Sequence, residues 1–234
     1  MAKKLSSDVR VYYGQYDLSP EATSIAIALA VEPLDPTALQ DSAERALSGL
    51  RKDTVEYSGL FDDSGTGMDA AQAALTATGT AVFSVLIGTG TGDRAYAGTA
   101  YLLAAKSPAA IADLVKQEAV LKPDQAWDRG VHFGPSISKP SSAQVTSGTL
   151  DNAALSTAGG VGYFHIFAVS SGTINCNFQE SAIGTTWTSI LSGTLLVTEG
   201  TSARLPITGT IQRYTRVSLD GTGIGTAMGI LVRS

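Results

Sequence analysis

Short runs of β-branched and aromatic residues, each ended by glycine or serine, recur along this chain and restrict it to a fold of many short strands. The run Ala81–Ile87 ends at the glycine-rich stretch 88–92, and further along Ile174, Cys176 and Phe178 alternate with polar residues. Gly, Ser and Thr contribute 25, 24 and 25 of the 234 residues, which is too many small and turn-forming residues for long helices to dominate. The pattern predicts a mainly β protein with antiparallel strands.

Charge is divided unevenly along the chain. Residues 1–134 carry 11 Lys/Arg and 17 Asp/Glu, a net charge of −6, whereas residues 135–234 carry 5 and 4, a net charge of +1. The change coincides with a stretch rich in proline and serine. We therefore expect a first β unit at 1–134, a linker at 135–144 and a second β unit at 145–234. The acidic first unit disfavours nucleic-acid binding through a broad basic surface.

Apolar runs, and apolar residues that alternate with polar ones, predict further strands. They are expected at Val9–Tyr13, 54–61, Asp93–Ala104, Arg129–Phe133, Tyr163–Val169, Ile211–Leu219 and around Met228, Ile230 and Val232. Within Ile211–Leu219 the alternation is imperfect, and the spacing of Arg213 and Arg216 predicts a β-bulge.

Two segments have the pattern of short helices. In 35–49, Asp35 suits the N-cap, Pro36 the first helical position and Gly49 the end of the helix. The second segment, Met68–Ala77, is rich in alanine. Segment 108–121 stays open, because it begins like a helix but lies among strands.

Residues with catalytic or metal-binding chemistry are scarce. The chain has one cysteine, Cys176, and two histidines, His132 and His165, all within apolar strand patterns that indicate packed core residues. Asp62–Asp63 is the one adjacent pair of acids, and it lies in a polar loop for which a turn is favoured over weak calcium binding. We expect no cofactor, no metal site, no membrane segment and no enzymatic activity.

Several short motifs, in order, resemble one family. They are Val11-Tyr-Tyr-Gly-Gln-Tyr-Asp-Leu-Ser19, Val31-Glu-Pro-Leu-Asp35, Gly49-Leu-Arg-Lys52 leading into Val55-Glu-Tyr-Ser-Gly-Leu-Phe-Asp62, Gly92-Asp-Arg-Ala-Tyr96, Asn177-Phe-Gln-Glu-Ser181 and Gln212-Arg-Tyr-Thr-Arg-Val217. With these motifs the chain resembles the major tail proteins, or tail tube proteins, of long-tailed, non-contractile bacteriophages.

The resemblance implies a fold and a function. It implies an antiparallel β-sandwich or barrel of tail-tube type with one or two short helices, followed by a second sandwich-like module. Six copies would close into a ring, rings would stack into a tube, and DNA would pass through without specific binding. Other partners would be tail proteins such as the tape measure and the tail terminator, and the location would be the virion tail after assembly in the host cytoplasm. The resemblance also favours a long loop or hairpin over a helix at 35–49, and extended structure at 108–121.

Six charged residues are candidates for subunit interfaces or the lumen. Asp41, Glu44, Asp53 and Glu56 lie in or beside the segment expected to face neighbours or the channel, and Lys3 and Lys4 lie on a polar N-terminal arm expected to dock onto an acidic neighbour.

Two other function classes compete with this interpretation. A carbohydrate-binding or adhesive sandwich is suggested by Trp187 in the second unit, with Trp127 as another tryptophan able to stack on sugars. A hydrolase with paired carboxylates is the other alternative, although no residue pair marks it.

Overall fold

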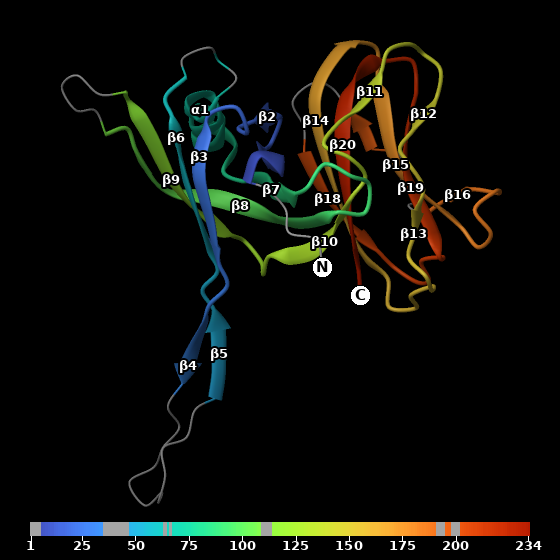
Figure 1. Cartoon of the computed structure of the whole chain (residues 1–234), viewed down its shortest axis with the longest axis horizontal. Coiled ribbons are helices and arrows are strands. Elements are labelled where there is room, and N and C mark those ends of the chain that lie inside the picture. The colour runs from blue at the N-terminus through green and yellow to red at the C-terminus, as the bar shows by residue number, and fades with distance from the viewer. Residues whose placement is uncertain are drawn as a thin grey trace, which may run out of the picture.

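The computed structural model describes residues 6–34, 47–62, 65, 67–108, 114–190, 195–197 and 202–234. These residues are mainly in antiparallel strands (Figure 1), with the single α-helix of the described chain, α1, at Met68–Thr78 and a 3-10 turn at Ser6–Asp8. The predicted fold class, mainly antiparallel β with a short helix, is therefore confirmed.

The largest sheet contains twelve strands. Its main path runs β18 (Ser202–Ile207), β14 (Gly160–Ser171), β20 (Ile224–Arg233), β10 (Asp128–His132), β8 (Arg94–Lys106), β7 (Ala81–Ile87), β1 (Val9–Tyr13) and β2 (Tyr16–Asp17). From β8 a branch continues through β9 (Lys116–Pro123) and β6 (Thr54–Leu60) to β3 (Ala22–Ala28), and β11 (Ile137–Lys139) pairs with β20.

Two smaller sheets complete the fold. The six-stranded sheet contains β12 (Val145–Thr146), β19 (Tyr214–Asp220), β15 (Ile174–Ser181), β16 (Thr188–Ser189), β13 (Leu150–Asp151) and β17 (Leu195–Val197). The third sheet is the pair β4 (Val31–Leu34) and β5 (Leu47–Arg51).

The first half of the chain curls its strands and α1 around one core. Tyr13, Tyr57, Phe83 and Leu121 are buried in that core, and Met68 packs there from the helix. The helix begins where the Glu21 carboxylate accepts the Met68 amide hydrogen over 3.3 Å, which satisfies one of the unpaired amides of its first turn. It ends before Gly79, whose φ of +82° suits the left-handed position after a helix.

The second half forms a sandwich. Its core lies between the β14–β20 part of the large sheet and the β15–β19 sheet, where Phe164 and Phe178 stack with ring centroids 4.4 Å apart. A Cβ at Gly162 would lie 2.3 Å from Cε2 of Phe178, so this position needs glycine for the two sheets to approach.

The two halves share hydrogen bonds as well as apolar contacts. β10 pairs with β8 on one side and with β20 on the other, so one ladder passes from the first half into the second. A further core joins Tyr12 and Leu86 of the first half to Tyr163 and Met228 of the second. Segment 135–144, expected as a linker, contains β11 and the fully buried Lys139.

Several predicted elements are present with close boundaries, and others differ. The helix at Met68–Ala77 and the strands Val9–Tyr13 and Ala81–Ile87 are confirmed. The prediction of a β-bulge between Arg213 and Arg216 was wrong. β19 begins at Tyr214 and pairs with β15 in unbroken register. Of the expected helix at 35–49, residues 47–49 are strand, while 35–46 lie outside the described residues. The open segment 108–121 is strand from Lys116 onward, and 109–113 lie outside the described residues.

Candidate functional site

A two-stranded arm leaves the body of the molecule as a continuation of two sheet strands. β3 continues into β4 and β5 continues into β6, so Ala28 pairs with Thr54 and Val31 pairs with Arg51 along one ribbon. Between these pairs, the amide of Lys52 donates to the carbonyl oxygen of Ala30 over 2.8 Å. Figure 1 shows β4 and β5 projecting away from both cores.

Asp53 holds the base of this arm. Its side chain is only 2% exposed, and its two oxygens accept the amide hydrogens of Ala30 over 3.2 Å and of Trp127 over 3.3 Å. Arg51 lies across it, with Nη2 2.7 Å from Oδ2. The carboxylate therefore replaces ladder hydrogen bonds at the point where the ribbon leaves the sheet, and it ties the arm to the segment before β10.

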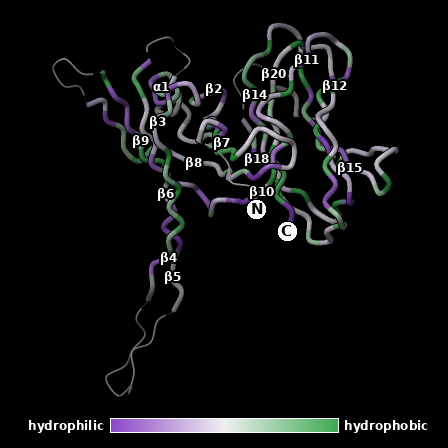
Figure 2. Tube along the Cα trace, in the orientation of Figure 1, coloured by the Kyte–Doolittle hydropathy of each residue, from purple (hydrophilic) through white to green (hydrophobic). Residues whose placement is uncertain are grey.

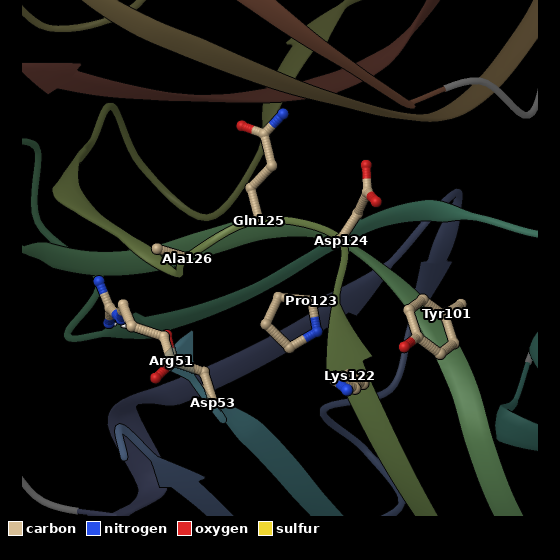
Figure 3. A pocket seen from close by; sticks show the side chains of 8 residues that line it. All are labelled: Arg51, Asp53, Tyr101, Lys122, Pro123, Asp124, Gln125 and Ala126. Atoms are coloured by element: carbon tan, nitrogen blue, oxygen red, sulfur yellow. Dashed lines mark ion pairs between the residues drawn. The ribbon is translucent and has the colours of Figure 1, made fainter. Parts of the chain in front are cut away.

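A polar hollow of about 320 Å³ lies beside this base (Figure 3). Arg51 and Asp53 form one wall and Tyr101 another, with Pro123 between them in the view. Lys122 and Asp124 add one charge of each sign, so the hollow has no net preference for a charged ligand. It is better understood as the junction that orients the arm than as a ligand site.

Exposed apolar side chains gather on the arm and at one end of the sheet. On the arm, Leu29 is 54% exposed and Val31 48% exposed. At the end of β6 and the start of β9, Phe61 and Leu114 are exposed, and the Phe61 amide bonds to the carbonyl oxygen of Val115. In Figure 2 hydrophobic and hydrophilic stretches alternate along the ribbon that leads to the arm. Neighbouring apolar side chains left in water mark surfaces that other proteins cover.

The strand next to the arm has an open edge. β3 pairs with β6 on one side, and among the described residues no strand pairs with its other side. Glu56 of β6 and Glu118 of β9 line a shallow hollow on the adjoining sheet face. The arm, the edge of β3 and this acidic face thus lie together on the first half of the molecule.

The site residues predicted from the sequence differ in their exposure to solvent. Glu56 is exposed on β6, as a surface role requires, whereas Asp53 is buried and its carboxylate is used inside the chain. Asp53 is therefore corrected from a contact residue to an anchor of the arm. Lys3, Lys4, Asp41 and Glu44 lie outside the described residues. Leu29 and Val31 are not among the site residues predicted from the sequence. Their apolar character, just before a segment rich in polar residues, is nevertheless visible there.

Both histidines, His132 and His165, and the cysteine Cys176 are buried in the described core. The ring of His165 donates from Nδ1 to the carbonyl oxygen of Gly14 over 2.8 Å, so its Nε2 accepts the Ser84 hydroxyl over 2.7 Å. Burial lowers the pKa of His165 to about 4 and raises the pKa of the Cys176 thiol to about 12. Ser84 and His165 have the spacing of a nucleophile and its base, but both are fully buried, which prevents contact with a substrate.

Among the described residues, no group of three or more His, Cys, Asp or Glu side chains is placed to hold a metal ion. In the same part of the chain, no helix has both the length and the apolar content to cross a membrane.

The two tryptophans are partnered within the fold. Trp127 is buried with its ring edge against Phe83. Trp187 has the guanidinium of Arg216 4.1 Å from its ring centroid, and Gln179 holds that guanidinium with a 2.8 Å hydrogen bond. One face of Trp187 is therefore already covered, which leaves less of the ring for a sugar.

Comparisons with known proteins give only distant similarities. No protein-family model matches the chain, and no curated protein matches its sequence. A chain of the virion of the native gene transfer agent particle is 15% identical, with a TM-score of 0.45 over 54% of this chain and 98% of that one. A chain of the SPP1 tail tube is 13% identical, with a TM-score of 0.46 over 54% of this chain and 78% of that one. The SPP1 Dit protein is 8% identical, with a TM-score of 0.37 over 97% of this chain and 99% of that one.

Proposed function

We propose that this chain is a structural virion protein, the subunit that builds the tube of a long, non-contractile phage tail by associating with copies of itself. The observation that carries the proposal is the arm β4–β5, which extends beyond both cores and presents Leu29 and Val31 to solvent. The family resemblance of the sequence motifs points to the same role.

The arm needs a partner for physical reasons. A two-stranded ribbon without a third strand or a packed face is at best marginally stable in water. Its exposed apolar side chains, together with the open edge of β3, favour pairing with another chain over isolation. A second copy of the protein is the partner that a repeating assembly requires, and each copy then both gives an arm and receives one.

The finer proposals follow the family resemblance. Six copies form a ring, rings stack into a hollow tube in the virion tail, and assembly takes place in the host cytoplasm with the tape measure and tail terminator proteins as further partners. The excess of acidic residues in 1–134 supports a channel that lets DNA slide, because phosphate contacts would hold the polymer. Lys3, Lys4, Asp41, Glu44 and Glu56 remain proposed contact or lumen residues.

The experiment compares self-association of the wild type with that of the double variant Leu29→Ser and Val31→Ser. Sedimentation velocity over a range of concentrations is expected to show large assemblies for the wild type and loss of most of them for the variant, because the variant removes apolar contacts made only between copies. The matched control is Ile183→Ser, which changes an apolar residue that is 70% exposed in the second half of the chain.

Two results would contradict the proposal. One is a wild type that stays monomeric even when added to tail-initiating complexes. The other is a pair of arm substitutions with no more effect on assembly than the Ile183 control.

A further inference from the structure

Three arginines from three adjacent strands share one face of the large sheet. Arg94 of β8 pairs with Val131 of β10, and Val131 pairs in turn with Leu231 of β20. Paired residues in antiparallel strands lie on the same face, and so do residues two apart along a strand. Arg94, Arg129 and Arg233 are therefore on one side of the sheet.

These side chains line a shallow hollow of about 340 Å³. The other lining residues are Gly130, Val131, Asn152 and Leu231. No carboxylate is among the described residues that line it. Three cations around one hollow are conspicuous in a chain with 16 Lys/Arg and 21 Asp/Glu.

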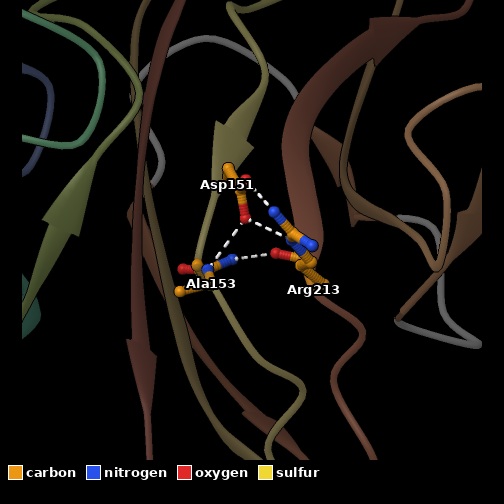
Figure 4. A network of polar contacts seen from close by, with 4 residues as sticks. Asp151, Ala153 and Arg213 are labelled. Carbon is orange, nitrogen blue, oxygen red and sulfur yellow. Dashed lines mark hydrogen bonds and ion pairs between the residues drawn. The ribbon is translucent and has the colours of Figure 1, made fainter.

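Two acidic residues that are next to lining residues in the sequence, Asp128 and Asp151, are engaged elsewhere. Asp128 lies on the opposite face from Arg129, where it accepts the hydroxyl hydrogen of Tyr163 and lies 3.8 Å from Arg204. Asp151, next to Asn152, is held by Arg213 through two hydrogen bonds of 2.7 and 2.6 Å and accepts the amide hydrogen of Ala153 (Figure 4). These hydrogen bonds, with that from Arg213 the largest cause, lower the pKa of Asp151 to about 2. Neither carboxylate is left to neutralise the three arginines.

The three guanidinium groups have N–H donors that no residue of the described chain uses. No hydrogen bond or ion pair joins the Arg94 or Arg129 side chain to another described residue. Arg233 donates from Nη2 to the carbonyl oxygen of Ala154 over 2.6 Å, which fixes its position. Its Nε is buried and has no hydrogen-bond partner among the described residues. The exposed guanidinium groups of Arg94 and Arg129, beside the fixed Arg233, can therefore donate to an acceptor that comes from outside the chain.

We propose that Arg94, Arg129 and Arg233 form an oxyanion-binding pocket that takes a phosphate or carboxylate group. Guanidinium groups match both oxyanions through paired N–H donors, and three of them around one hollow suit a group with several oxygens. The pocket lies on the β8–β10–β20 ladder that joins the two halves of the molecule, so an ion bound there contacts strands from both halves.

The test is a titration of the full chain with inorganic phosphate, followed by amide NMR. Saturable shifts are expected at amides around Gly130, Asn152 and Arg233, whereas chloride at equal ionic strength produces none that saturate. The double variant Arg94→Gln and Arg129→Gln is expected to bind phosphate about tenfold more weakly or worse, because two charge-assisted donors are lost. The control Lys106→Gln and Lys116→Gln removes two exposed cations from another part of the sheet and is expected to keep the wild-type affinity.

A second arm of the experiment identifies the source of the oxyanion. If the Arg94/Arg129 variant also loses self-association in sedimentation and phosphate disperses wild-type assemblies, the natural occupant is a carboxylate of a second copy. If association is unchanged while phosphate binding is lost, the occupant is a free phosphate-bearing molecule. Shifts that do not saturate, or that persist in the arginine variant, would overturn the proposal whether or not the protein forms tubes.

Discussion

His165 belongs to the second half of the chain, and both of its side-chain hydrogen bonds go to residues of the first half. It lies on β14, while its partners Gly14 and Ser84 come from the turn after β1 and from β7. Its ring also lies beside those of Tyr12 and Phe167. The neutral imidazole therefore fills a buried position where a charged one would lack a counter-ion.

Acid is expected to destabilise the protein through this residue. The folded-state pKa of His165, about 4, lies below its ordinary value of 6.5, so the unfolded chain binds more protons and stability falls as pH drops below that value. Between about pH 7 and about pH 5 the loss is about 2 kcal/mol from this group. Urea unfolding of the wild type and of His165→Gln at both pH values measures it. An equal decline in both proteins would exclude His165 as the cause.

Lys139 is a second buried residue with a testable role. Its ammonium group donates to the carbonyl oxygens of Ser141, Gly221 and Gly223 at 2.7, 2.9 and 2.8 Å, which joins the segment after β11 to the turn before β20. Lys139→Met keeps the stem but leaves three carbonyls without this donor, and it is expected to cost about 2–4 kcal/mol of unfolding free energy. Lys116→Met, at an exposed position, is the control. Equal stabilities of the two variants would show that the three hydrogen bonds contribute nothing net.

The sequence predicted the burial of some of these side chains and not of others. The apolar surroundings of His165 and Cys176 in the sequence correctly placed both in the core. Nothing in the sequence separated Lys139 from an ordinary surface lysine, because two of its three acceptors are main-chain carbonyls more than 80 residues away that only folding brings close. For the same reason Asp53 resembled an exposed charge, although its partners come from segments 23 and 74 residues away.

At the scale of elements, the arm and its base depend on Asp53. Asp53→Ala is expected to increase hydrogen exchange at the amides of Ala30 and Trp127, because each loses its acceptor while the strands on either side keep their ladders. Amide exchange followed residue by residue checks this. Asp124→Ala removes an exposed carboxylate from the same hollow and is expected to leave both amides unchanged. Exchange that rises equally in both variants would contradict the role given to Asp53.

Local sequence pattern correctly predicted three of the elements. The helix α1 and strands β1 and β7 follow from alanine content and apolar runs. The pattern at 35–49 fitted a helix, yet its final residues pair with β4 as part of a ribbon. The pairing continues from β3–β6 as far as Val31 and Arg51, and a one-residue register shift then precedes the pair of Pro33 with Ser48. Helix propensity takes no account of such pairing. Alternation in Met228, Ile230 and Val232 suggested one buried face. β20 is instead a central strand with both faces buried, because Leu231 packs in one core cluster and Ile230 in another.

At the scale of the whole molecule, the hydrogen-bonded ladder passes from one half of the chain to the other. The pairs between β10 and β20 join residues about a hundred positions apart, and local sequence carries no signal for such a pairing. Composition and the charge change led to an expected boundary at 135–144, but they did not predict that β8, β10 and β20 would form one continuous surface. This surface carries the three arginines, while the arm and the open edge of β3 lie on the first half.

Self-association into a tube is measured most directly by electron microscopy of the purified protein, alone and with tail-initiating complexes. We expect stacked rings or tubes with an axial hole, in which the arm of each subunit reaches a neighbouring copy. Assemblies without an axial hole, or tubes in which every arm lies against its own subunit, would contradict this expectation.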